Sequence, residues 1–227
     1  LESIAIADDT LSLVTGPATV TQLDAKTLDV AGSIDLGVAG AIDTTVAASG
    51  TDLYAVTQTP SEWVVTLLRN SAVERRATVA GSDAPVAVAA DDAHLWIVTA
   101  TSVTTLSTTA LDDPATISAP RDATPLHSAA AANGAVWFTG GNAHDLYALH
   151  ANDAVPTVIP LVERTGTADR IPVSVVAGRD AVFALVQASD DPQQHDVVIA
   201  KIVPASEKVT HRVALPSDLF VGAIAVS

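Results

Sequence analysis

Apolar residues along this chain occur in short runs, and polar turns separate the runs at a nearly constant spacing. Each of five such runs follows a turn rich in Asp, Asn or Gly, residues that tolerate the positive φ of a tight hairpin. Runs this short between such turns predict β-strands. The five runs begin 41 to 46 positions apart and are Leu11–Val14, Leu53–Val56, Leu95–Val98, Val136–Thr139 and Val182–Leu185.

Three further strands are predicted around each run. A strand of small residues precedes the turn, in Ser3–Ala7, Thr45–Ala48, Val86–Ala90, Ser128–Ala132 and Val173–Ala177. A third strand ends in an aliphatic residue, namely Leu23, Leu68, Leu106, Leu149 and Ile202. A fourth strand closes each unit, in Ala31–Leu36, Arg75–Val79, Ala115–Ser118, Thr157–Leu161 and Thr210–Leu215. The sequence therefore predicts five repeats of four strands.

Four short strands in a repeat of about 42 residues is the period of a β-propeller, so the predicted fold class is all-β, with four-stranded antiparallel blades. The Ala-rich first strand, most marked in Ala129–Ala132, suits the crowded inner edge of a wedge-shaped blade. The second strand carries an aromatic at one fixed place, as Tyr54, Trp96, Trp137 and Phe183. Such side chains fill the gap between neighbouring sheets. The alternative is a β-sandwich in which apolar and polar residues alternate in this pattern by chance.

The repeats resemble the β-propeller superfamily, especially its YVTN, PQQ-like and WD40-like types. The stretch Val20–Thr27 is similar to the third strand and turn of a YVTN-type blade. No repeat carries the Gly-His and Trp-Asp signature of WD40 blades, so the resemblance implies a scaffold and no particular activity.

We expect residues 1–227 to be one propeller domain or a fragment of one, with blades at about 2–37, 44–80, 86–119, 128–162 and 173–216. The stretch 221–227 matches the first strand of another blade, most clearly in Val221–Val226. This extra strand predicts that the sequence covers part of a propeller with six to eight blades. The alternative is a five-bladed ring whose last strand overlaps an edge elsewhere. An open end also predicts apolar faces that associate with missing blades of the same protein or with a second copy.

The charge balance of 26 acidic against 11 basic residues gives a net charge of −15, which argues against a nucleic-acid partner. The chain has no Cys, which excludes disulfides and thiolate metal sites. No apolar stretch is long enough to insert into a membrane. We expect an extracellular or cell-envelope location. This expectation rests on the acidic composition, on the absence of Cys and on the usual location of proteins in the family that the repeats resemble.

Repeat length varies mainly between the second and third strands, in the connections Thr57–Trp63, Thr139–Asp145 and Gln187–Asp196. In propellers these connections share a face with the links between blades, and ligand contacts gather on loops held by a rigid frame. The candidate ligand-binding residues on this face are Trp63, Arg121, His127, His144, Arg164 and Arg170.

Each candidate has a structural alternative. Trp63 is of a type enriched at binding hot spots, but it could instead cap the edge of a blade. The Arg and His residues could bind an anion or carboxylate, or they could be solvated loop charges paired with nearby acids. Acidic residues and His that could hold a divalent cation occur without any known metal-binding spacing, so no metal and no cofactor is predicted. These residues are Asp190, Asp191, His195, Asp196, His144 and Asp145.

The leading functional hypothesis is a non-catalytic scaffold that recognises a protein, peptide or glycan. The sequence has no Gly-x-Ser-x-Gly elbow, no His-Glu-x-x-His pair and no phosphate loop, so catalysis has weak support. The alternative is a propeller hydrolase or lyase with a metal in the central funnel. Such an enzyme would gather His and carboxylate side chains around one point.

Overall fold

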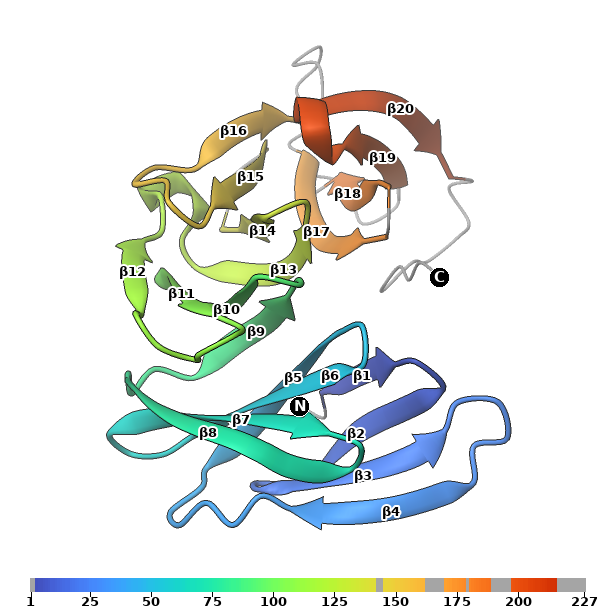
Figure 1. The fold of residues 1–227 in the computed structure, drawn as a ribbon. Coiled ribbons are helices and arrows are strands. Elements are labelled where there is room, and N and C mark those ends of the chain that lie inside the picture. Colours follow the sequence, from blue (N-terminus) through green and yellow to red (C-terminus); the bar gives the residue numbers. More distant parts are fainter. Residues whose placement is uncertain (1–2, 142–144, 162–169, 179, 189–196, 216–227) are drawn as a thin grey trace. The chain divides into compact units, whose positions relative to one another are not determined.

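The computed structural model is built almost entirely of β-strands (Figure 1). It describes residues 3–141, 145–161, 170–178, 180–188 and 197–215, which include two short 3-10 turns, η1 (Arg121–Ala123) and η2 (Pro204–Ser206). Among the described residues, no helix is long and apolar enough to cross a membrane. The chain divides into two compact units, Leu1–Thr99 with Val103–Thr116 and Ala100–Ser102 with Ile117–Ser227.

Three four-stranded sheets begin in the first unit, and in each of them consecutive strands are neighbours. The first sheet contains β1 (Ile4–Ala7), β2 (Thr10–Gly16), β3 (Thr19–Asp24) and β4 (Val30–Asp35). The second contains β5 (Asp43–Ser49), β6 (Asp52–Gln58), β7 (Glu62–Arg69) and β8 (Ala72–Ala80). The third contains β9 (Pro85–Ala90), β10 (His94–Thr99), β11 (Ser102–Ser107) and β12 (Ala115–Ser118).

The second unit holds two sheets of the same order. The fourth sheet contains β13 (Leu126–Ala132), β14 (Ala135–Gly140), β15 (Asp145–His150) and β16 (Thr157–Pro160). The fifth contains β17 (Arg170–Ala177), β18 (Val182–Ala188), β19 (Val197–Val203) and β20 (Lys208–Ala214). All five predicted four-strand repeats are confirmed. The predicted extra strand at 221–227 lies outside the described residues, and the number of blades stays a prediction.

Alternating side chains of each strand pack on opposite faces of its sheet, as the pleat requires. In the second sheet Leu53 and Ala55 join a buried cluster with Val14 and Val20 of the first sheet. Tyr54, the next residue of the same strand, joins a separate cluster that includes residues of the third sheet. A strand buried on both faces explains why the predicted runs are continuously apolar instead of alternating.

The aromatic position of the repeat is buried in three of the four sheets that carry it. Tyr54 is 2% exposed, and Trp96 and Trp137 are 0% exposed. Trp137 packs between the fourth and fifth sheets, in a cluster that includes Ala184. Its indole N–H donates to the carbonyl of Ala132 at 3.2 Å. Phe183, the fourth aromatic, is only half-buried.

Two kinds of polar contact between neighbouring sheets recur, and the sequence analysis missed both. The backbone N–H of Val46 donates to the Ser3 hydroxyl at 3.0 Å, and the N–H of Val175 donates to the Ser128 hydroxyl at 3.1 Å. Each Ser belongs to the first strand region of one sheet, and each Val to the first strand of the next. These contacts satisfy backbone groups at a strand edge and link the sheets in register.

Outer strands are linked by arginine. Arg76 of β8 donates to the carbonyl of Leu36, which follows the last strand of the first sheet. Arg212 of β20 donates through Nε to the carbonyl of Leu161 at 2.8 Å, at the same place after the fourth sheet. Leu36 and Leu161 are both 0% exposed. The guanidinium group thus satisfies a carbonyl where the chain leaves a sheet beside a buried leucine.

Replacing Trp137 or Trp96 by Ala should lower the free energy of unfolding by about 3–5 kcal/mol, because each change empties a large buried volume. Thermal melts and denaturant titrations measure this loss. The control is Val155→Ala, since Val155 is 74% exposed and should shift stability by less than about 0.5 kcal/mol. Melting temperatures of both Trp variants within a degree or two of the parent would contradict their place in the core.

Candidate functional site

At the second sheet, the structure describes the predicted face that carries the loop between the second and third strands and the links between sheets. The β6–β7 hairpin and the links before and after this sheet lie at one end, because Ile42 N–H donates to the Gln58 carbonyl at 2.8 Å. The Gln58 side chain in turn donates to the Ser82 carbonyl at 2.7 Å. The predicted loop Thr57–Trp63 is longer than the observed one, because Gln58 and Trp63 pair across the hairpin and leave only residues 59–62 between them.

Trp63 lies in β7 and is 3% exposed. Its indole N–H donates to the Asp83 carbonyl at 2.9 Å. A Cβ added at Gly81 would lie 2.7 Å from three ring atoms, so only glycine allows the backbone to cross the indole so closely. The ring therefore covers the link to the third sheet, which is the structural alternative considered for it. A role in ligand binding stays a prediction.

A pocket of about 400 Å³ opens at this end of the second sheet. We call it the hairpin pocket. Its walls come from the link after the first sheet, from the β6–β7 hairpin and from β7 and β8. The lining residues are Gly37, Val38, Ala39, Thr59, Pro60, Ser61, Glu62, Val64, Arg76 and Thr78.

The hairpin that forms one wall is held by its own hydrogen bonds. Thr59 N–H donates to the Glu62 carbonyl at 2.9 Å, and Glu62 N–H donates to the Thr59 hydroxyl at 3.2 Å. The Thr59 hydroxyl also donates to the Glu62 carbonyl at 2.9 Å. Glu62 is half-buried, and Ser61 and Thr78 are exposed. The pocket therefore offers one carboxylate, two hydroxyl groups and the guanidinium of Arg76 beside apolar walls.

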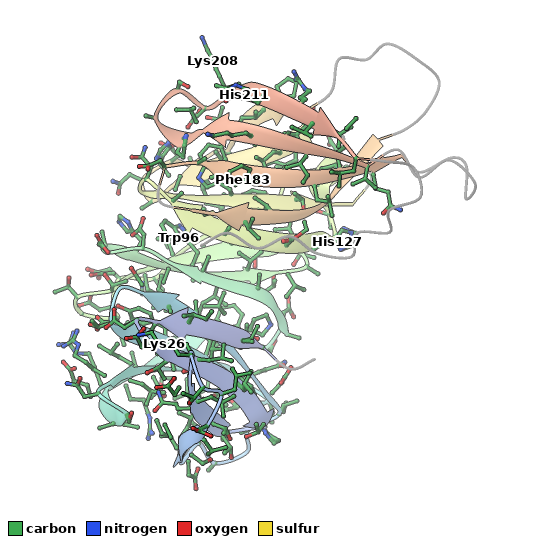
Figure 2. All side chains as sticks on the ribbon, turned by 90° about the vertical axis from the view of Figure 1, so that its right-hand side faces the viewer. Lys26, Trp96, His127, Phe183, Lys208 and His211 are labelled. Atoms are coloured by element: carbon green, nitrogen blue, oxygen red, sulfur yellow. The ribbon has the colours of Figure 1, made fainter. Side chains whose placement is uncertain are left out.

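The other predicted site residues belong to the second unit. Arg121 is exposed in η1, and His127 is exposed in β13, where Figure 2 labels it. Arg170 is the first residue of β17, but its side chain is not among the described ones. His144 and Arg164 lie outside the described residues. The predicted grouping of these side chains around an anion stays a prediction.

A second pocket of about 300 Å³ lies at the tight turns of the second and third sheets. We call it the turn pocket. A bidentate ion pair dominates it: Arg69 Nε lies 2.7 Å from Asp52 Oδ1, and Nη2 lies 2.7 Å from Oδ2. Arg69 Nη1 also donates to Glu74 at 2.8 Å. The lining residues are Ser49, Gly50, Thr51, Asp52, Tyr54, Arg69, Asp91 and Asp92.

The ion pair shifts the pKa values of the ionisable side chains in this pocket. The Arg69 hydrogen bonds hold the pKa of the Asp52 carboxyl below its usual value, and Asp52 raises the pKa of Arg69. Burial, followed by the Asp52 charge, raises the pKa of Tyr54 to about 12. The pair was missed, although Leu53 and Leu68 are cross-strand partners and place Asp52 beside Arg69. The opposite charges of Asp52 and Arg69, at the ends of two strands predicted to be neighbours, could have revealed the ion pair.

The Asp91 carboxylate accepts the backbone N–H groups of Ala93 and His94 at 2.9 and 2.8 Å, as is typical of an Asp in a tight turn. His144 and the acidic and His residues between 190 and 196, considered above for a cation, lie outside the described residues. Within the ranges that are described, no group of three or more His, Cys, Asp or Glu side chains could hold a metal ion.

No family of known proteins and no curated protein sequence matches the chain. Two solved structures match the chain. Glutaminyl cyclase from Myxococcus xanthus is 13% identical, with a TM-score of 0.49 over 83% of this chain and 90% of that protein. U3-55K is 11% identical, with a TM-score of 0.67 over 94% of this chain and 65% of that protein.

This chain thus spans just under two thirds of the length of U3-55K. The likeness to U3-55K and the five four-stranded antiparallel sheets confirm a β-propeller architecture. At this identity the likeness concerns the fold alone.

Acid should remove the contribution of Asp52 to stability. Because its pKa is lowered in the folded state, the ionised carboxylate stabilises the fold fully above its ordinary pKa of 3.8, and the contribution is lost as the pH falls through the folded pKa. Near neutral pH we expect Asp52→Asn to lower Tm by about 2–4 °C, and the Tm values of parent and variant should approach each other as the pH falls below 3.8. Asp83→Asn, an exposed control, should change Tm little. A pH-independent Tm difference for Asp52→Asn would contradict the assignment.

Purified and dialysed protein should hold no stoichiometric transition metal, because the chain has no Cys and no paired His at ligand spacing. Elemental analysis by mass spectrometry measures this directly. One equivalent of zinc, manganese or iron would contradict the prediction and favour the metal-dependent enzyme instead.

Proposed function

We propose that this chain is a non-catalytic recognition scaffold that binds a protein, peptide or glycan at the hairpin pocket, as part of an exported or cell-envelope protein. The observation that carries the proposal is the pocket itself, about 400 Å³ between a hairpin and a link that two rigid sheets hold in place. Sites of this kind, on loops over a rigid frame, are the usual binding sites of such folds.

Hydrogen bonds already hold the hairpin of the pocket in one conformation, so the hairpin does not have to become ordered when a ligand binds. Thr59 makes three hydrogen bonds with the backbone of Glu62. Gln58 ties the same hairpin to Ser82 in the next link. A ligand that enters therefore pays little entropy for ordering loops, and more of its contact energy appears as affinity.

The chemistry of the pocket suits a small polar group that also has an apolar face. Glu62 can accept hydrogen bonds from hydroxyl or amide groups, and Ser61 and Thr78 can donate or accept them. Val38 and Val64 supply apolar contact beside them. A sugar ring or the backbone and one side chain of a peptide offers this combination.

The proposed location has separate support in the composition. The net charge of −15 favours solubility and discourages binding to anionic polymers. The absence of Cys makes folding independent of the oxidising conditions outside the cytoplasm.

Arrays of short peptides and of oligosaccharides test the proposal, with the strongest hit titrated by calorimetry. Glu62→Gln should weaken that binding by at least about tenfold, because it removes a charged hydrogen-bond acceptor. Ser61→Trp should block the pocket and remove binding.

The matched control is Asp92→Asn, which changes an exposed carboxylate in the turn pocket and should leave the affinity unchanged. The absence of any hit on both arrays would contradict the proposal. So would a hit whose affinity Glu62→Gln and Ser61→Trp both leave intact.

A further inference from the structure

The first sheet has one face that is packed and one that is apolar and open. Val14 and Val20 belong to the packed face, in a buried cluster with the second sheet. On the other face Ile4 pairs with Leu13, and Ile6 with Leu11. Ile4, Ile6 and Val30 are 59%, 62% and 70% exposed. We call this surface the first-sheet face; it consists of Ile4, Ile6, Leu11, Leu13, Leu23 and Val30.

The equivalent face of other sheets is covered by a sheet. Leu53 and Ala55, which hold the places of Leu11 and Leu13 in the repeat, are buried against the first sheet. Leu95 and Ile97 are buried in a cluster with the second sheet, and Ala184 in a cluster with the fourth. Large apolar side chains exposed together on one face mark an interaction site. The repeat thus indicates that the cover of the first-sheet face is itself a four-stranded sheet.

Backbone groups at the edge of β1 support the same conclusion. Val14 N–H donates to the Ser3 carbonyl at 3.0 Å. Ser3 and Val14 are therefore a hydrogen-bonded pair, and the next pair, Ile4 with Leu13, leaves the N–H and C=O of Ile4 pointing away from β2. Val46 and Val175 hold the place of Ile4, and a serine hydroxyl of the neighbouring sheet accepts the N–H of each.

The fifth sheet carries the matching elements. Ser174 pairs with Leu185 as Ser128 pairs with Thr139, so Ser174 holds the place of the linking serine. Phe183 holds the place of Tyr54 and Trp137, the aromatics that cover a neighbouring sheet, and is half-buried. Leu185, on the same face, is buried.

The exposed part of that face of the fifth sheet lies toward its outer strand. Val213 is 56% exposed. Figure 2 shows Phe183, His211 and Lys208 on this sheet, and Lys201 pairs with both Phe183 and His211. We call this surface the fifth-sheet face; it consists of Phe183, Lys201, His211 and Val213.

The rims of the two faces differ in charge. Asp8, Asp9, Asp24 and Asp29 lie at the turns beside the first-sheet face, with Lys26 paired to Asp9 at 2.9 Å. Lys201 lies within the fifth-sheet face and Lys208 lies at the adjoining turn, next to Glu207, whose carboxylate pairs with His150. The lysines on the fifth sheet and the aspartates beside the first-sheet face are oppositely charged, which favours their contact and disfavours contact of either face with its own kind.

We propose that the first-sheet face docks the fifth-sheet face of a second copy of this chain. The contact would repeat the packing that joins consecutive sheets within each unit, with Phe183 over Leu11 and Leu13 and the Ser174 hydroxyl at the backbone of Ile4. Because two different faces meet, the association is head to tail, and two copies close into a ring or further copies extend a chain.

Light scattering of the 227-residue protein across a wide concentration range tests the proposal. The parent should have at least twice the monomer mass, with the mass rising as concentration rises. Ile6→Asp should raise the dissociation constant at least about tenfold, because it buries an unpaired charge, and Val213→Asp should do the same from the other face. Val30→Asp is a second variant of the first-sheet face, and circular dichroism confirms that each variant folds.

The decisive measurement mixes the two kinds of variant. Ile6→Asp keeps an intact fifth-sheet face and Val213→Asp keeps an intact first-sheet face, so the mixture should form a 1:1 dimer that neither variant forms alone. Val155→Asp, an exposed control in a turn of the second unit, should associate like the parent.

A parent that stays monomeric at all concentrations would overturn the proposal. An unchanged Val213→Asp dimer would also overturn it, since the first-sheet face would then meet its own copy.

Discussion

The structure depends on one constraint, that a sheet with two apolar faces must be covered on both. Leu53 and Tyr54 are neighbours in one strand, yet they lie in buried clusters with different sheets. The same constraint puts Trp137 between the fourth and fifth sheets. Dispersion and burial across these flat contacts provide most of the stability of each unit, and the polar contacts set the register.

Polar contacts between sheets occur where the chain enters or leaves a sheet. Ser3 satisfies the backbone of Val46 at an inner strand, and Arg76 satisfies the carbonyl of Leu36 at an outer strand. Ser128 and Arg212 repeat both contacts in the second unit. An unpaired backbone group in these places would cost as much as a lost hydrogen bond, so the contacts favour one relative position of neighbouring sheets over a slipped one.

The two ends of the second sheet differ in chemistry, and this difference guides the functional argument. At the turn end, Asp52 and Arg69 neutralise each other, and Asp91 binds the backbone of its own turn. At the hairpin end, Glu62 stands beside hydroxyl groups and apolar side chains in an ordered pocket. Side chains already paired with the fold offer little to a ligand, and in the hairpin pocket these are Thr59 and Arg76. Ser61, Glu62 and Thr78 are the polar groups of that pocket on which the proposed binding depends.

The sequence by itself determined the strands, the four-strand repeat and the buried aromatic position, because period and turn residues are local properties that a sheet expresses directly. It could not place Trp63 or Arg69. A rare tryptophan beside a turn looks the same whether it faces solvent or, as here, lies under Gly81. Only the tertiary structure decided which side chains pack against a neighbouring sheet and which line a pocket, because the register between sheets depends on contacts about forty residues apart that no local pattern records.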